Sequence, residues 1–202
     1  MKNVAQKSSP KKRTAQKPRI LESLTGSDAL SILKILAERH DNLAKEIDTI
    51  AEELLREVDV EDLAADVKDA LEFLDVEDVW DRSGQRRDGY VDPGDAAWEM
   101  FDEALEPFRR DIEKYRRLCM LTEVNLYYQG ILKGIHDFDR ESMTEYKQWA
   151  VDAPGEYFGQ VLNEWKAIPD GRLPLSVMGK FIDEHCPAYA KWGARLLQSR
   201  RR

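Results

Sequence analysis

Apolar residues recur at steps of three and four through most of this chain after residue 20, and this spacing constrains its fold more than any other feature. Such steps place apolar side chains on one face of an α-helix. Several of these segments open with a proline, namely Pro93, Pro154, Pro174 and Pro187. The first turn of a helix tolerates proline, and no segment alternates as a half-buried strand does. The sequence therefore predicts an all-α fold for residues 20–199, with about eight helices in an irregular bundle or short solenoid-like array.

The polar loop at residues 81–92 precedes the longest apolar-periodic segment. A calcium loop of the EF-hand type requires glycine at its sixth position. Counting from Asp81, the sixth residue is Arg86, and the adjacent Arg87 would also repel a divalent cation. We therefore predict a turn here, and we predict no metal ligand, catalytic residue or cofactor in the chain. Arg86, Arg87 and Tyr90 are candidates for an interaction surface.

The same loop has a simple conformational interpretation. Gly84 and Gly89 are expected to adopt positive φ, and the Tyr90 ring is expected to fold back onto the core. Asp92 is expected to cap the following helix. Pro107 lies inside that helix, where it removes one backbone hydrogen bond, so we expect a kink or a restart there.

A helical hairpin is predicted at the start of the globular part. Ser27 or Asp28 is expected to cap its first helix, and Asp41 its second. The break between the helices, at residues 40–42, is short, so they are expected to lie antiparallel. The apolar positions are Leu30, Leu33, Ile35 and Leu36 in the first helix and Leu43, Ile47, Ile50, Leu54 and Val58 in the second.

Residues 22–55, which contain SLTGSDALSILKILAERHDNLAKEIDTIAEELL, resemble the helical segment that follows the zinc finger in some SWIM-domain proteins. In those proteins, too, a basic linker precedes a leucine-rich helix, a turn of the form LAERxxxL and a second helix. The zinc ligands of that family, CxC followed by CxH, are absent here. The resemblance therefore implies a helical, partner-associated module without a zinc function.

Two further patterns concern helix ends and helix packing. The sequence Asp-Val-Glu-Asp occurs at Asp59 and again at Asp75, and in each copy the first Asp is expected to cap a helix. Gly130 and Gly134 lie four residues apart in a helical segment. They leave a smooth strip on which another helix can pack closely, or, alternatively, a ligand can bind.

Charge is divided unevenly along the chain. Residues 1–19 contain seven Lys or Arg and no Asp or Glu, whereas residues 20–194 hold all 39 acidic side chains against 20 basic ones. Low hydrophobicity and like charge predict a disordered basic arm over residues 1–19. Its possible polyanion contacts are Lys11, Lys12, Arg13 and Lys17. A solubilising leader is the alternative, and the acidic body would itself repel nucleic acid.

No residue pattern indicates an enzyme. The best acid–base candidate is His136, beside Asp137 and Asp139, but no nucleophile accompanies it and a solvated helix end is an ordinary place for histidine. His185 and Cys186 are adjacent instead of at zinc-ligand spacing. The two cysteines lie far apart in the sequence, which favours reduced thiols in a cytoplasmic protein.

These observations favour a non-enzymatic helical scaffold or protein–protein interaction module. Exposed tryptophan and tyrosine side chains would be its natural anchors. The alternative is a nucleic-acid-associated accessory protein that uses the basic arm. An enzyme with an unrecognised helical active site is a third hypothesis. No apolar run approaches the length of a transmembrane helix and no secretory signal is visible, so we expect a cytoplasmic protein with no membrane partner.

Overall fold

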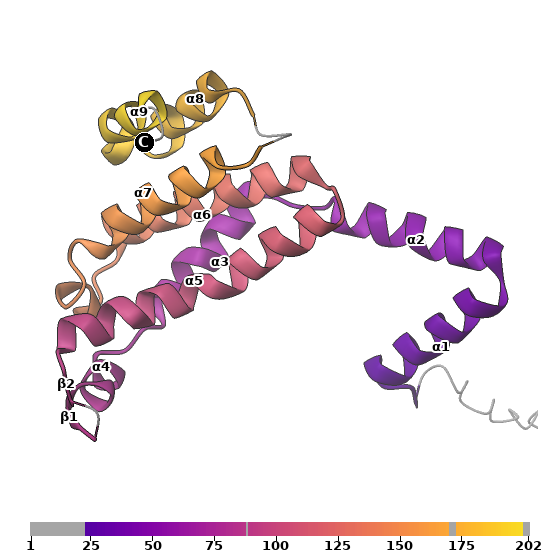
Figure 1. The fold of residues 1–202 in the computed structure, drawn as a ribbon, viewed down its shortest axis with the longest axis horizontal. Helices are drawn as coiled ribbons and strands as arrows, with labels where there is room; N and C mark the ends of the chain where they lie inside the picture. The colour runs from indigo at the N-terminus through magenta and orange to yellow at the C-terminus, as the bar shows by residue number, and fades with distance from the viewer. Residues whose placement is uncertain (1–22, 88, 170–172, 200–202) are drawn as a thin grey trace, which may run out of the picture. The chain divides into compact units, whose positions relative to one another are not determined.

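The computed structural model describes residues 23–87, 89–169 and 173–199, and over these residues the predicted all-α fold is confirmed (Figure 1). The described part holds nine α-helices, close to the eight expected, and one two-stranded antiparallel sheet. The predicted arm, residues 1–19, lies outside the described residues. The elements in chain order are α1 (Gly26–Arg39), α2 (Asp41–Leu55), α3 (Val60–Glu72), α4 (Val76–Arg82), β1 (Gly84–Arg86), β2 (Gly89–Val91), α5 (Pro93–Arg117), α6 (Leu121–Glu141), the 3-10 turn η2 (Glu145–Gln148), α7 (Ala153–Lys166), α8 (Leu175–His185), the 3-10 turn η3 (Pro187–Tyr189) and α9 (Ala190–Gln198).

The contacts between elements divide the chain into two compact units, Met1–Leu55 and Arg56–Arg202. The expectation of one domain over residues 20–199 stays a prediction. In the first unit the chain reverses at His40, but Figure 1 shows α1 and α2 diverging from this turn. The expectation that the two helices lie antiparallel along their length is therefore wrong. The cap of α1 is Thr25 and not Ser27 or Asp28. Asp28 instead completes a capping box, because its carboxylate accepts from the Thr25 backbone N–H at 3.1 Å.

Helix α6 is the centre of the second unit, where it contacts α3, α5, α7 and α8. Figure 1 shows α3 and α6 running in one direction and α5 and α7 running in the other. The core consists of the apolar side chains between these helices. Its largest fully buried members are Trp165, Tyr146, Phe101, Phe138, Phe158, Leu71, Leu105, Ile131, Leu132, Ile135, Leu162 and Met178.

The predicted close packing at Gly130 and Gly134 is confirmed, and α3 is the helix that occupies this strip. A Cβ atom at Gly130 would lie 2.6 Å from Leu63 Cδ2, and one at Gly134 would lie 2.6 Å from Val67 Cβ and 2.7 Å from the Ala64 carbonyl oxygen. Only glycine allows this approach of the two backbones. The alternative of a ligand on this strip is therefore wrong, because α3 fills it.

Aspartates begin three successive helices, as predicted. The Asp59 carboxylate accepts from the backbone N–H groups of Glu61 and Asp62, and the Asp75 carboxylate accepts from that of Glu77. Asp92 caps α5 in the same way. Each cap satisfies backbone donors that would otherwise lack partners at a helix start.

Helix α5 runs without a break through Pro107, so the predicted restart is wrong. Pro107 and Glu103, the residue whose carbonyl loses its partner, are both exposed, and water can satisfy that carbonyl. The buried stripe on the opposite side, which includes Leu105 and Ile112, continues across the proline. Packing of this stripe keeps both halves in one helix.

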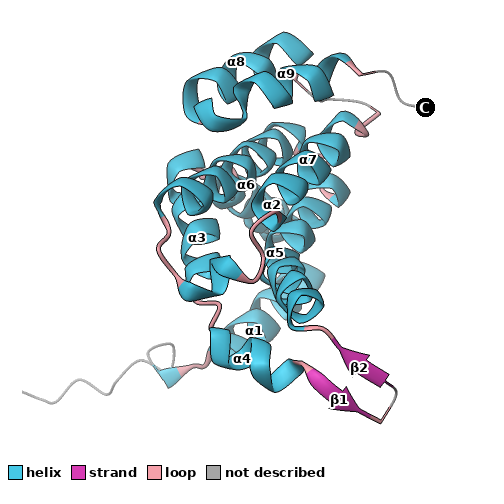
Figure 2. Ribbon diagram, turned by 90° about the vertical axis from the view of Figure 1, so that its left-hand side faces the viewer, coloured by secondary structure: helices cyan, strands magenta, loops and turns pink. Residues whose placement is uncertain are grey.

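The loop at residues 81–92 contains a short β-hairpin that the sequence pattern did not predict (Figure 2). Gly84 and Gly89 have φ of 89° and 138°, which confirms the predicted positive values. Gln85 pairs with Tyr90 across the two strands. Tyr90 is 67% exposed, so the expectation that its ring folds back onto the core is wrong. With three residues per strand, the hairpin is too short to bury one face.

Asn125 joins α6 to α7 and to the chain that follows. Its side-chain oxygen accepts from Trp165 Nε1 at 2.9 Å and from the Leu173 backbone N–H at 3.0 Å. Its amide nitrogen donates to the Leu121 carbonyl. Because these groups are buried or half-buried, the hydrogen bonds satisfy polar atoms that would otherwise be costly inside the unit.

We predict that Gly130→Ala and Gly134→Ala each destabilise the protein by about 2 kcal/mol or more, because the new methyl group overlaps α3. This loss exceeds the gain of about 1 kcal/mol in helix propensity. Gly155→Ala is the control, since open space surrounds a Cβ at that position in α7. Denaturant unfolding checks both, and the Gly130→Ala/Leu63→Ala double variant should lose less than the two single losses combined. Neutral or stabilising Gly130 and Gly134 variants would contradict the packing argument.

Candidate functional site

The first unit exposes an extensive apolar surface on α1 and α2. Neither helix has a buried residue. Seven large aliphatic side chains are between 36% and 63% exposed, namely Leu30, Ile32, Leu33, Ile35, Leu43, Ile50 and Leu54. We call these seven residues the hairpin surface. An exposed apolar surface of this extent typically marks an interaction site.

The predicted interaction residues Arg86, Arg87 and Tyr90 are all exposed at the β-hairpin. Arg86 Nη2 donates to the carbonyl oxygen of Asp81 at 3.1 Å, which connects the hairpin to the end of α4. The four predicted polyanion contacts, Lys11, Lys12, Arg13 and Lys17, lie outside the described residues.

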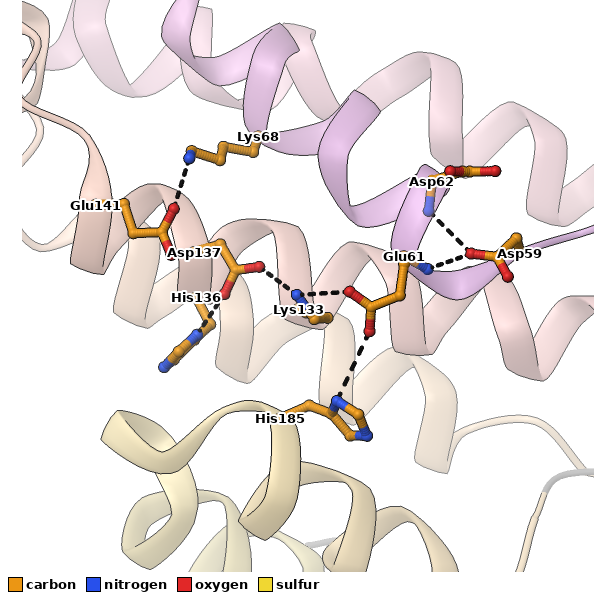
Figure 3. Close-up of polar contacts among 9 residues, drawn as sticks. All are labelled: Asp59, Glu61, Asp62, Lys68, Lys133, His136, Asp137, Glu141 and His185. Carbon is orange, nitrogen blue, oxygen red and sulfur yellow. Dashed lines mark hydrogen bonds and ion pairs between the residues drawn. The ribbon is translucent and has the colours of Figure 1, made fainter.

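A chain of polar contacts surrounds His136, the acid–base candidate from the sequence (Figure 3). His136 is buried within α6, which continues to Glu141, so the expectation of a solvated helix end is wrong. Its Nδ1 lies 2.9 Å from Oδ1 of Asp137. An ionised carboxylate only accepts, so Nδ1 carries the proton. Among the described residues Nε2 has no hydrogen-bond partner, and the ring of Tyr189 packs edge-on against the imidazole.

Lys133 extends this chain toward α3. Its Nζ lies 2.6 Å from Oδ2 of Asp137 and 3.1 Å from Oε2 of Glu61. Glu61 in turn lies 3.8 Å from Nδ1 of His185 in α8 (Figure 3). The contacts therefore connect α3, α6 and α8 through a series of basic and acidic side chains.

Burial and hydrogen bonding have opposite effects on the pKa values of Asp137 and Lys133. Burial alone would raise the pKa of the Asp137 carboxyl, but hydrogen bonds from Lys133 and His136 hold it below the ordinary value of 3.8. Burial alone would lower the pKa of Lys133, but its hydrogen bonds to Asp137 and Glu61 raise it above 10.5. Both groups are therefore charged near neutral pH.

The arrangement around His136 supports the packing of three helices more directly than it supports a reaction. Asp139, the other expected partner, is paired with Lys147 instead. The thiol of Cys186 is fully buried, and burial raises its pKa to about 12, so it is protonated and a poor nucleophile. Within the described part of the chain, no group of three or more His, Cys, Asp or Glu side chains could hold a metal ion.

A groove on α7 was not predicted from the sequence. It measures about 940 Å³ and is lined by Trp98, Glu156, Gly159, Gln160, Asn163, Glu164, Ala167, Trp192 and Leu196. A second hollow of about 640 Å³ shares Trp98, Glu156 and Trp192 with it, and adds Asp139, Val151, Asp152, Gly155 and Tyr189. We call the two together the tryptophan groove. Trp98 and Trp192 are far apart in the sequence, so no local motif could have indicated it.

In the part of the chain that the structure describes, no helix is both long and apolar enough to cross a lipid bilayer. Comparisons with protein-family models, with curated proteins and with solved structures found no match to this chain.

We predict that Asp137→Asn lowers the free energy of unfolding by about 2 kcal/mol at pH 7, because two charge-assisted hydrogen bonds are weakened. The depressed pKa means that the stabilisation is present above pH 3.8 and is lost as the pH falls through the lower, folded-state value. The difference between the wild type and the variant should therefore shrink below pH 4. Unfolding by denaturant from pH 7 to pH 2.5 measures it, with Asp66→Asn, an exposed α3 position, as the control. A difference that is constant across this range would contradict the assignment.

Proposed function

We propose that this chain is a helical interaction module and that a partner protein covers its hairpin surface. The observation that carries the proposal is that α1 and α2 expose seven large aliphatic side chains and have no buried residue. The resemblance of residues 22–55 to a partner-associated helical segment of SWIM-domain proteins supports the same assignment.

The energetics of so small a helical pair favour a covered state. Helices of this length are marginal in water on their own, and most of their stability in proteins comes from packing of the apolar face. Covering one half-exposed Leu or Ile contributes about 1 kcal/mol. Seven such residues supply enough driving force for a specific complex.

The distribution of polar residues indicates the geometry of such a complex. Four polar side chains of α1 follow one narrow stripe, Ser27, Ser31, Lys34 and Glu38, and the other two, Asp28 and Arg39, lie outside the stripe in the first and last turns. A helix that is apolar around most of its circumference normally packs on two sides. Near the turn at His40 one side of α1 faces α2, and the rest of its apolar surface is available to an amphipathic helix of the partner.

Charge indicates what flanks the apolar stripe of that partner helix. Helix α2 contains five acidic residues and one basic residue, Lys45. Like charges would oppose the pairing of two copies of this hairpin, whereas a helix with Lys or Arg beside its apolar stripe would complement it. We therefore propose a basic amphipathic helix of another protein as the occupant.

We predict that the double variant Leu33→Glu/Ile50→Glu weakens partner binding more than tenfold, because each substitution places a charge in the apolar contact. Ser31→Glu/Thr49→Glu adds the same charge at exposed polar positions and should leave binding within about twofold. Candidates come from in-cell crosslinking, and each is purified and titrated against the full chain. Hydrogen exchange in residues 26–55 should slow on binding.

Two results would contradict this proposal. One is that the double variant abolishes the binding of none of the purified candidate proteins. The other is a self-associated chain in sedimentation, lost in the double variant, which would make the occupant a second copy.

The composition of residues 1–19 supports a second candidate function, association with nucleic acid. We predict that duplex DNA binds the full chain with an affinity that falls steeply with salt, because Lys and Arg displace counterions. Fluorescence anisotropy from 50 to 300 mM salt measures it, and deletion of residues 2–19 should abolish binding. Binding that survives the deletion, or does not depend on salt, would overturn this candidate.

A further inference from the structure

The tryptophan groove combines aromatic side chains with carboxylates. Trp98 comes from α5 and Trp192 from α9, and both are half-exposed. Gly159 of α7 forms the floor beneath Trp192, since a Cβ there would lie 2.5 Å from the edge of the indole ring. The Trp98 carbonyl accepts from the Tyr157 hydroxyl, and the two rings lie 5.8 Å apart. These contacts pack both indoles against other side chains of the second unit.

The charge of the groove has a single sign. Its lining residues include the carboxylates of Asp139, Asp152, Glu156 and Glu164, and none of them is Lys or Arg. Lys147 pairs with Asp139, and the Gln160 amide donates to Glu164. Asp152 and Glu156 have no ion-pair partner among the described residues. Beside the two indole rings, two exposed carboxylates therefore lack a positively charged partner among the described residues.

We infer that the tryptophan groove binds lysine or arginine side chains from an extended basic segment of another protein. An indole face attracts a cation through its quadrupole, and tryptophan is the best aromatic residue for this contact. Asp152 and Glu156 supply the counter-charge at the start of α7. The apolar side chain of Leu196 in the lining contacts the methylene stem of such a side chain, which is itself apolar.

This inference is independent of the hairpin surface. It uses α5, α7 and α9 of the second unit and no residue of α1 or α2. A partner that covers the hairpin surface leaves the prediction for the groove unchanged. Either proposal can therefore be contradicted without affecting the other.

The test uses the full chain and a fluorescein-labelled peptide of twelve residues in which lysine alternates with serine. We expect a Kd of about 0.1 mM or tighter at 50 mM salt, measured by anisotropy. The same peptide with acetylated lysines, which keep their length but lose their charge, should bind at least tenfold more weakly. A glutamate–serine peptide should not bind.

Variants assign the binding to the groove. Trp98→Leu should weaken the lysine peptide at least tenfold, whereas Trp80→Leu, at an exposed position outside the groove, should leave it within twofold. Asp152→Asn/Glu156→Gln should weaken it about fivefold, against no change for Asp183→Asn/Glu184→Gln, which removes the same charge on α8. Circular dichroism confirms that each variant is folded, and the near-isosteric carboxylate variants keep the test valid if Trp98→Leu unfolds.

Several outcomes would overturn the inference. One is that the lysine peptide does not bind, and another is that the acetylated peptide binds with equal affinity. A third is that the α8 control variant weakens peptide binding as much as Asp152→Asn/Glu156→Gln does, which would indicate only general attraction to an acidic surface. Binding that appears only when residues 1–19 are removed would place a segment of this same chain in the groove in place of another protein. In contrast, chemical-shift changes of the Trp98 and Trp192 indole N–H groups on addition of the lysine peptide would support the inference.

Discussion

The contact between α3 and the two glycines of α6 is the constraint on which the second unit depends. With no side chain at Gly130 or Gly134, the backbone of α3 approaches α6 until Leu63 and Val67 fill the space that Cβ atoms would occupy. This approach places Lys68 within 2.6 Å of Glu141 and Glu61 within 3.1 Å of Lys133. The polar contacts therefore follow from the packing of two helices, and α5, α7 and α8 assemble around the same central helix.

Most of the fold could be predicted from the sequence, because its signals are local. Asp59, Asp75 and Asp92 each precede a helix and cap it, as their places in the sequence predicted. Pro107 misled the interpretation because a proline on an exposed helix face removes only a hydrogen bond that water can replace. The β-hairpin was missed because three-residue strands do not alternate long enough to give a pattern.

The candidate sites were less predictable, because they depend on which residues meet in space. His136 looked like a solvated helix end, yet α6 continues past it and Tyr189 covers its imidazole. The tryptophan groove needs Trp98 from α5 and Trp192 from α9, which are far apart in the sequence. Only the general expectation that tryptophans would serve as anchors pointed toward it. The hairpin surface was partly predictable. All of its residues except Ile32 were expected to form the apolar face of a helix, but none was expected to be exposed.

The parallel packing of α3 on α6 also affects how the protein is made. Lys68 and Glu141 are 73 residues apart in the sequence, so a ribosome must add several helices before α3 meets the surface that buries it. Contacts this distant are slow to form because the intervening loop must close first. During synthesis the apolar face of α3 therefore cannot pack on α6 until α6 has emerged, and an apolar surface exposed in that interval favours aggregation.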